Sequence, residues 1–549
     1  TFNDWAATIA AGGWALEREP ATGLWVGTFA LAPGTHAYKL VLDERDWIAD
    51  PRAPASAPDG FGGQNSTIDV ACDGDADDPA AHVPGEARPP GFPFDDDSDG
   101  ALVSAAHLDA YLAAATSLAH RAAGDLEDLV GCDGSADRAG CGRQLVERFG
   151  RRAFRRPLEP GEVERYGALI ARASTFAAGA EDAIAAMLVS PSFLYRSEVG
   201  AEQDDGTYRL DAWEIASALS YTFWATMPDD ALLEAAASGG LDDAAGIERE
   251  ARRLLDDPRS REVVGEFALQ WLGAEAVETV DKNPALFPDF DSATRRALAR
   301  ETADFAAHVV FDASGRFGEL LTADYTLLDP AAAAFYGLSS AGGGSQVVRH
   351  PDGRRAGLLG HASLLAATSH SDQTSPIRRG LFVRRQLLCQ DLPPPPADAG
   401  GVPEVDPDAS TRDRFAQHTA DPVCAGCHRY TDGIGFGFES FDPIGRWRDS
   451  ENGQPIDGAG DLNDVERLGT GTSAPFASLA ELGAILSESG AARSCFVRQT
   501  VRFARGYKET LADRCGRLWL EDRFAGSGGD VRQLLLDLVL APDFAVRRR

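Results

Sequence analysis

Long apolar stretches and a surplus of positive charge are both missing from this sequence of 549 residues. No run approaches the ~18–20 apolar residues that a helix needs to cross a bilayer, so we expect no transmembrane segment. Asp and Glu together number 85 against 52 Lys and Arg, and the formal net charge is −33. Because an acidic surface repels phosphate backbones, we expect no nucleic-acid partner.

Signatures of common enzyme classes are absent as well. The sequence contains no nucleotide-binding loop, no Ser-His-Asp arrangement and no internal repeat. Methionine occurs only as Met187 and Met227, both in stretches of helical pattern, where Met is typical as a core filler. Glu301 and Asp304 fall on one helical face, and we interpret them as solvated rather than catalytic. These absences leave few side chains on which chemistry can be placed.

One short motif does carry chemistry, namely Cys424-Ala425-Gly426-Cys427-His428. C-x-x-C-H is the attachment signature of a c-type haem, in which both thiols bind the porphyrin and the His binds the iron. A zinc knuckle normally needs a second Cys/His pair at similar spacing, which the sequence lacks. A thioredoxin-like redox pair does not need the His. The motif therefore predicts one covalent haem c with His428 as a metal ligand.

The second axial ligand of such a haem is open. His418 lies ten residues before His428, and Asp421-Pro422 between them can fold the chain back. We take His418 as the first candidate, with His370 and His361 behind it. The alternative for His418 is a surface residue or a contact to a propionate. A water-bound iron is a further alternative, and it would permit peroxide chemistry.

The stretch after the motif, Ile434 to Gly445, is rich in Gly and aromatic residues. Glycine lets a backbone approach closely, so this stretch can lie against a porphyrin with Phe436 in the apolar wall. Arg446 and Arg448 follow, and either can pair with a propionate through two hydrogen bonds. Their alternative role is that of surface arginines.

Cysteine use indicates the compartment. Of 8 Cys, six remain outside the motif, which allows 15 pairings into three disulfides. Only Cys132–Cys141 can be proposed from the sequence, because Asp133-Gly134-Ser135 turns the chain between them. Covalent haem and disulfides both belong outside the cytosol, so we expect an exported protein, periplasmic or extracellular. No signal peptide precedes Thr1, and we expect that the targeting segment has been removed or lies upstream.

Hydrophobic patterning divides the chain. Alternation over residues 24–29 and 37–42, with a turn at Pro33-Gly34, predicts strands within residues 1–72. Residues 73–100 are rich in Asp, Pro and Gly and indicate a solvated linker. Helical patterns are predicted over residues 101–123, 141–154, 160–173, 180–196, 211–225, 247–256, 259–272, 291–312, 354–367, 376–389, 478–488, 494–506 and 529–540.

Residues 140–545 resemble the planctomycete cytochrome C-like multidomain proteins, which also occur in myxobacteria. The matching residues are Arg155-Arg156-Pro157-Leu158, Ser190–Arg196, Leu219-Ser220-Tyr221, Trp224, Pro228-Asp229-Asp230, Gln270-Trp271-Leu272, Thr374-Ser375-Pro376, Arg379-Gly380, Pro393–Pro396, His418, Cys424–His428 and Gly445–Arg448. The resemblance implies helical domains at 101–200 and 201–345, a haem c module at 346–470 and a closing helical domain at 471–549. The family's activity is largely undefined, so the resemblance supports the haem more than any reaction.

Residues 1–72 separately resemble the glycogen-binding, family-48 carbohydrate-binding modules. The motif is Phe2-Asn3-Asp4-Trp5, Pro33–Lys39, Trp47, Asp50-Pro51 and Phe61–Asn65. The resemblance implies an all-β immunoglobulin-like sandwich in which Trp5, Lys39, Trp47 and Asn65 contact α-glucan. Many relatives use this domain only to pack against a catalytic domain, and the two Trp could equally be sandwich core. The first strand of such a sandwich is missing before Thr1.

The sequence therefore predicts a multidomain, exported, monohaem c-type cytochrome that transfers electrons to or from an unidentified redox partner protein. One alternative is a haem peroxidase or oxidase acting on sugars bound by the sandwich. Another is an extracellular structural or assembly protein that carries a haem, and a homo-oligomer is compatible with all three.

Overall fold

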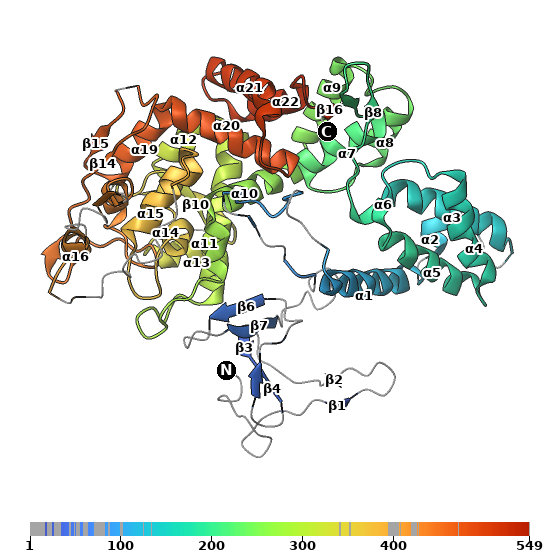
Figure 1. Cartoon of the computed structure of the whole chain (residues 1–549), viewed down its shortest axis with the longest axis horizontal. Helices are drawn as coiled ribbons and strands as arrows, with labels where there is room; N and C mark the ends of the chain where they lie inside the picture. Colours follow the sequence, from blue (N-terminus) through green and yellow to red (C-terminus); the bar gives the residue numbers. More distant parts are fainter. Residues whose placement is uncertain are drawn as a thin grey trace. The chain divides into compact units, whose positions relative to one another are not determined.

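The computed structural model describes residues 17–18, 25–26, 34–42, 46–48, 50, 55–58, 64–70, 83–85, 88–89, 91–98, 103–124, 126–132, 134, 136–339, 342–350, 353–392, 406, 408–418, 425–426, 428–469 and 471–547. This part of the chain is mainly helical, with a few small sheets (Figure 1). It forms two compact units, residues 1–87 with 101–196 and residues 88–100 with 197–549. Of the helices described, none combines the length and apolar character of a membrane span.

The first unit begins with short antiparallel strands. β1 (Glu17–Arg18) pairs with β2 (Trp25–Val26), and β4 (Leu40–Leu42) pairs with β5 (Asp46–Ile48). β7 (Gln64–Val70) lies between β3 (Gly34–Tyr38) and β6 (Ala55–Pro58). The alternation predicted over residues 37–42 thus corresponds to β3 and β4. These sheets are small, and the immunoglobulin-like sandwich stays a prediction.

Six helices complete the first unit. They are α1 (Ala105–Ala122), α2 (Leu126–Val130), α3 (Arg138–Ala153), α4 (Pro160–Arg172), α5 (Phe176–Leu188) and α6 (Pro191–Leu194). Leu145, Ile170, Ile184 and Met187 are each 1% exposed and form the core of α3, α4 and α5. The predicted disulfide Cys132–Cys141 is present.

Arg155 connects two stretches of the first unit that are far apart in sequence, Arg155–Leu158 and Ser190–Arg196. Its guanidinium is buried and donates to the carbonyl oxygens of Ser192, Phe193 and Tyr195 at 2.9, 3.1 and 2.7 Å. A buried guanidinium must find acceptors, and the α6 turn supplies them. The Arg155–Leu158 motif therefore fixes the end of this unit.

The second unit is a larger helical assembly. Its helices are α7 (Ala212–Trp224), α8 (Asp230–Ala237), α9 (Ala244–Leu255), α10 (Arg259–Leu272), α11 (Ser292–Phe311), α12 (Phe317–Thr322), α13 (Pro330–Phe335), α14 (Ala362–Ala367), α15 (Pro376–Phe382), α16 (Thr411–His418), α18 (Asp432–Gly435), α19 (Leu479–Glu488), α20 (Gly490–Arg505), α21 (Arg514–Gly526) and α22 (Val531–Leu540). The Asp211 side chain caps α7. The Asp211 backbone nitrogen in turn donates to Glu214 Oε2 at 2.9 Å, so the two residues form a capping box.

The second unit also contains short antiparallel strands. They are β8 (Ala201–Glu202) and β16 (Val546–Arg547) on either side of β9 (Tyr208–Arg209), β10 (Tyr325–Leu328) with β11 (Gln346–Arg349), β12 (Ser450–Glu451) with β13 (Gln454–Pro455), and β14 (Gly460–Leu462) with β15 (Ala474–Phe476).

One aromatic core runs through the second unit. α10 and α11 lie side by side in it (Figure 1), and Trp271, Phe305 and Phe496 are at most 1% exposed. Phe92 and Phe94, which lie in the stretch predicted to be a solvated linker, are 2% and 0% exposed in this core. Their aromatic rings outweigh the acidic composition around them, because burying a Phe side chain stabilises by roughly 1.5–3 kcal/mol.

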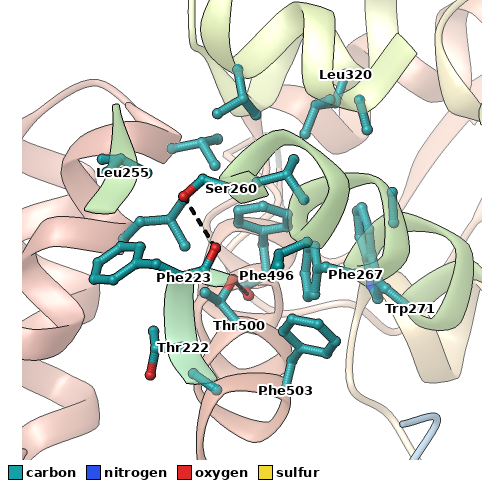
Figure 2. Close-up of a pocket in the computed structure, with 18 of the residues that line it drawn as sticks. Thr222, Phe223, Leu255, Ser260, Phe267, Trp271, Leu320, Phe496, Thr500 and Phe503 are labelled. Carbon is teal, nitrogen blue, oxygen red and sulfur yellow. Dashed lines mark hydrogen bonds between the residues drawn. The ribbon is translucent and has the colours of Figure 1, made fainter. Parts of the chain in front are cut away.

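A cavity in this core has an aromatic lining of Phe267, Trp271, Phe496 and Phe503 (Figure 2). Its hydroxyl groups bind the backbone: Ser260 Oγ donates to the Phe223 carbonyl at 3.0 Å, and Thr500 Oγ1 donates to the Phe496 carbonyl at 2.9 Å. The lining of the cavity is thus mainly apolar, and we place no chemistry in it.

A disulfide also ties the second unit together. Cys389, two residues after the π-helical turn Val383–Leu387, forms a disulfide with Cys495 of α20. The sequence did not indicate this pair, because 106 residues separate the two thiols. Cys515 is exposed and has no disulfide partner among the residues that the structure describes, and Cys72 lies outside them.

The solvated role expected for Glu301 is wrong. Glu301 is 2% exposed, and its carboxylate accepts from Tyr336 Oη at 2.6 Å and from Thr326 Oγ1 at 2.9 Å. Burial raises the pKa of Glu301 to about 7, although the two hydroxyl donors act in the opposite direction. The helical pattern of α11 was correct, but β10, α13 and α14 cover the face that we took to be exposed.

Candidate functional site

The C-x-x-C-H motif lies in the second unit between α16 and α18. Ala425, Gly426 and His428 are described, whereas Cys424 and Cys427 lie outside the described residues. The attachment role of the two thiols therefore stays a prediction, and the site is built here from His428 and what surrounds it.

His428 is paired with a carboxylate one helical turn further along the chain. Its Nδ1 lies 2.9 Å from Oδ2 and 3.1 Å from Oδ1 of Asp432. An ionised carboxylate only accepts hydrogen bonds, so Nδ1 carries the proton. The two side chains are 15% and 10% exposed. Nε2 is thus the nitrogen that would bind a metal, and the carboxylate sets the orientation of the ring.

Neighbouring backbone holds Asp432 in place. A Cβ on Gly435 would overlap the carbonyl oxygen of Pro376 in α15, and one on Gly380 would overlap that of Thr431. Only glycine permits such approaches. We expected the glycines after the motif to let the backbone approach a porphyrin. In the structure Gly435 brings α18 against α15 instead.

Phe436 lies at the edge of this packing. Its ring is 9% exposed, and the Arg412 guanidinium of α16 lies 4.3 Å from its centroid. Phe438 and Phe441, which follow it, are 1% and 0% exposed in the hydrophobic core. The contact predicted between Phe436 and a haem stays a prediction.

Arg448 belongs to a buried chain of charges. Its Nη2 donates to Glu439 Oε2 at 3.0 Å, and its Nη1 donates to Glu451 Oε1 at 3.1 Å. Arg379, 1% exposed, donates to Glu439 Oε1 at 3.2 Å. Burial raises the pKa of Glu439, and the two arginines act against that rise. The structure thus shows carboxylates where we expected Arg448 to meet a propionate.

Arg446 is directed elsewhere. Its guanidinium lies 5.0 Å from the centroid of the Phe335 ring and 4.0 Å from Asp289. The structure therefore does not bring Arg446 and Arg448 to one place. Their binding to haem propionates stays a prediction.

α16 forms the other wall of the site. Thr411 at its start donates to Glu451 through its backbone nitrogen at 2.6 Å and its Oγ1 at 2.8 Å. Phe415 is fully buried, and its ring centroid lies 6.4 Å from that of His428. His418 is the last residue of this helix, three positions after Phe415, and its side chain lies outside the described residues.

Four family models match the chain, and each is described as a protein of unknown function. They are DUF1595 over residues 141–198, DUF1592 over 210–338, DUF1588 over 355–451 and DUF1585 over 472–544. The chain carries four domains of the planctomycete cytochrome C-like family. The DUF1588 match contains the C-x-x-C-H motif.

These four matches agree with the resemblance expected from the sequence, and each matching model is described as a protein of unknown function. None of the four models covers residues 1–140, where we expected a carbohydrate-binding module. No curated protein and no solved structure matches the chain.

The described residues fit the haem that the cytochrome C-like family name suggests. A c-type haem needs a neutral imidazole directly after its second thiol, with the other ring nitrogen engaged. His428 agrees with this requirement, since its Nδ1 is engaged by Asp432. The i, i+4 spacing of His428 and Asp432 is visible in the sequence, and it is the signal by which Asp432 could have been found.

The two rival axial histidines differ in their surroundings. His361 is 2% exposed, with Nδ1 3.0 Å from Thr302 Oγ1 and Nε2 3.4 Å from Thr326 Oγ1. Both of its ring nitrogens are thus engaged in the core. His370 has a buried Nε2 that makes no hydrogen bond in the described part of the chain, and burial lowers its pKa. His370 therefore stays a candidate behind His418.

Two of the four predicted sugar-contacting residues lie together. Tyr38 at the end of β3 pairs with Ser66 of β7, and continuing this register places Lys39 opposite Asn65. Lys39 and Asn65 are both half-buried. The backbone of Trp47 pairs with Val41, but its side chain and all of Trp5 lie outside the described residues.

Proposed function

We propose that the protein is an exported monohaem c-type cytochrome that transfers single electrons between protein partners. The observation that carries the proposal is the His428–Asp432 pair, at hydrogen-bond distance, within a cytochrome C-like domain. A ligand histidine whose second nitrogen is held by a carboxylate is a general feature of metal sites. The two disulfides of the described chain agree with an oxidising compartment.

In this proposal each residue of the C-x-x-C-H motif has a separate role in holding the haem. Cys424 and Cys427 hold the porphyrin covalently, and His428 binds the iron through Nε2. His418 is our first choice for the second axial ligand, and a filled sixth position excludes peroxide. When bound, the haem supplies a one-electron ferric/ferrous couple. Phe415 and the α16 packing shield the His428 ring from water.

The test is covalent haem attachment. The chain is produced with a cytochrome c maturation system, denatured and extracted with acidified acetone, which removes haem that is not covalently bound. We expect the colour to remain on the protein, and Cys424→Ser/Cys427→Ser to lose it. Cys515→Ser is the matched control, because this exposed thiol lies outside the motif. A colourless wild-type protein that binds zinc would refute the proposal.

A spectrum separates electron transfer from catalysis. A six-coordinate, low-spin ferric haem that is inert to peroxide supports electron transfer. A high-spin haem that reacts with peroxide would replace it with the peroxidase or oxidase alternative.

We also propose that residues 1–72 form a sandwich that binds α-glucan weakly. Lys39 directly follows Tyr38 and Asn65 directly precedes Ser66, the last residue pair of β3 and β7, and this proximity favours the proposal because ammonium and amide groups on one surface can bind sugar hydroxyls. Electrophoresis in gels with glycogen should retard the wild type and not Lys39→Ala, whereas Lys508→Ala, an exposed lysine elsewhere, should behave as wild type. Equal mobility with and without glycogen would leave the domain a packing role.

A further inference from the structure

We propose that Asp432 is a positioning residue that gives the His428 imidazole anionic character and so holds the haem at a low reduction potential. The inference rests on the proposed function, because it needs a haem on His428. It adds the class of redox partner, a low-potential one-electron carrier.

The geometry supplies a strong hydrogen bond. Both Asp432 oxygens lie within 3.1 Å of His428 Nδ1, and an ionised acceptor makes such a bond roughly twice as strong as a neutral one. The bond draws the Nδ1 proton toward the carboxylate and leaves more electron density on Nε2. A more basic nitrogen is a better donor to the higher oxidation state of a metal.

The site is also nearly dry. The Asp432 and His428 side chains are 10% and 15% exposed, so water screens the carboxylate poorly. The half-reaction is the loss of one electron to an external acceptor, with no bond broken and the proton kept on Nδ1. It raises the charge of the site by one, and a fixed negative charge beside it stabilises the oxidised state more than the reduced state.

The carboxylate cannot easily turn away. The residues on either side of it, Thr431 and Gly433, pack against Gly380 of α15 and Asp461 of β14. Thr431 Oγ1 lies 3.0 Å from Asp432 Oδ1 and 3.3 Å from the His428 carbonyl oxygen, and in the shorter contact its proton competes with Nδ1 for the negative charge. The structure therefore contains one group that strengthens the effect and one that weakens it.

Substitutions at these two residues should therefore shift the midpoint potential of the haem in opposite directions. In the haem-loaded full chain, Asp432→Asn should raise the midpoint potential by at least 59 mV, a tenfold change in the equilibrium constant for one electron. Thr431→Val, which keeps the shape but removes the hydroxyl, should lower the potential. Asp457→Asn, an exposed carboxylate beside Arg412, should leave it near the wild-type value.

The outcomes separate the two proposals. A wild-type chain without haem overturns both this inference and the proposed function. A haem-loaded Asp432→Asn protein with an unchanged potential overturns the inference alone. Shifts of the same sign in Asp432→Asn and Thr431→Val would mean a general disturbance of packing, and that too overturns it. Ferric electron paramagnetic resonance gives a second readout, since its g-values should move in Asp432→Asn.

Discussion

At the scale of single residues, His418 and His370 are the candidates for the second axial position. His418 ends a helix whose Phe415 borders the His428 ring, and His370 has a buried Nε2 without a hydrogen bond in the described chain. Burial keeps the imidazole of His370 neutral by lowering its pKa. A neutral imidazole is a good ligand for iron, so the choice depends on position rather than on chemistry.

We predict that His418→Ala converts a low-spin ferric spectrum into a high-spin one, because the iron loses its sixth ligand. His370→Ala is the matched comparison and should leave the spectrum unchanged. Absorption and electron paramagnetic resonance spectra measure both. The reverse pattern would assign the ligand to His370, and a wild-type protein that is already high-spin would exclude both residues.

At the scale of elements, α15 and α18 approach each other closely at their backbones. Gly435 and Pro376 touch backbone to backbone, and Gly380 does the same against Thr431. This close packing fixes the turn that holds His428 and Asp432. The two short helices therefore act as the frame of the candidate site.

We predict that Gly435→Ala destabilises the protein by about 1–3 kcal/mol, because the added methyl group meets the Pro376 carbonyl and the helices must separate. Thermal unfolding measures the effect. Gly526→Ala, at the end of α21, is the control. Its Cβ would meet no atom within 4 Å, so it should be neutral or slightly stabilising. Equal melting temperatures for Gly435→Ala and wild type would contradict the close packing.

At the scale of the whole molecule, buried polar groups link elements that are far apart in sequence. Glu301 of α11 binds Tyr336 and Thr326, and His361 lies in the same cluster. Burial lowers the pKa of His361 to about 3, so this ring stays neutral at ordinary pH. Glu301, with a pKa raised to about 7, is the group of this cluster that titrates near neutrality.

This pKa predicts how stability depends on pH. The folded chain holds the Glu301 proton up to a pKa of about 7, whereas the unfolded chain releases it near the ordinary value of 4.5. Raising the pH between these values therefore favours unfolding. We compare the free energy of unfolding of the wild type with that of Glu301→Gln. The wild-type value minus the variant value should fall as the pH rises from 4.5 to about 7, and it should level off above that pH.

Denaturant unfolding at several pH values measures this difference. Glu488→Gln, which removes a carboxylate with 78% of its side chain accessible, serves as the control for a substitution outside the core. A difference for Glu301→Gln that stays flat between about pH 5 and 7 would mean that the carboxylate is already ionised in the folded chain.

Much of the local structure follows from the sequence alone. The capping box of Asp211 and Glu214, the Cys132–Cys141 disulfide and most helices were predicted correctly, because each depends on residues that are near neighbours in the chain. Short helices such as α16 and α18 were missed, since a few residues carry no periodic pattern. The C-x-x-C-H motif is likewise local, and so it could be recognised without a structure.

Tertiary structure decided the rest, because burial and ion pairing depend on which distant segments meet. The acidic, Pro- and Gly-rich composition around Phe92 and Phe94 predicted a linker. In the structure they pack in a core formed by helices some 170 to 400 residues further along the sequence. Arg448 looked free to bind a propionate, but the fold places Glu439 and Glu451 beside it. Glu301 looked solvated until other elements covered its face. The sequence by itself determined the motif, and the fold decided which carboxylates surround it.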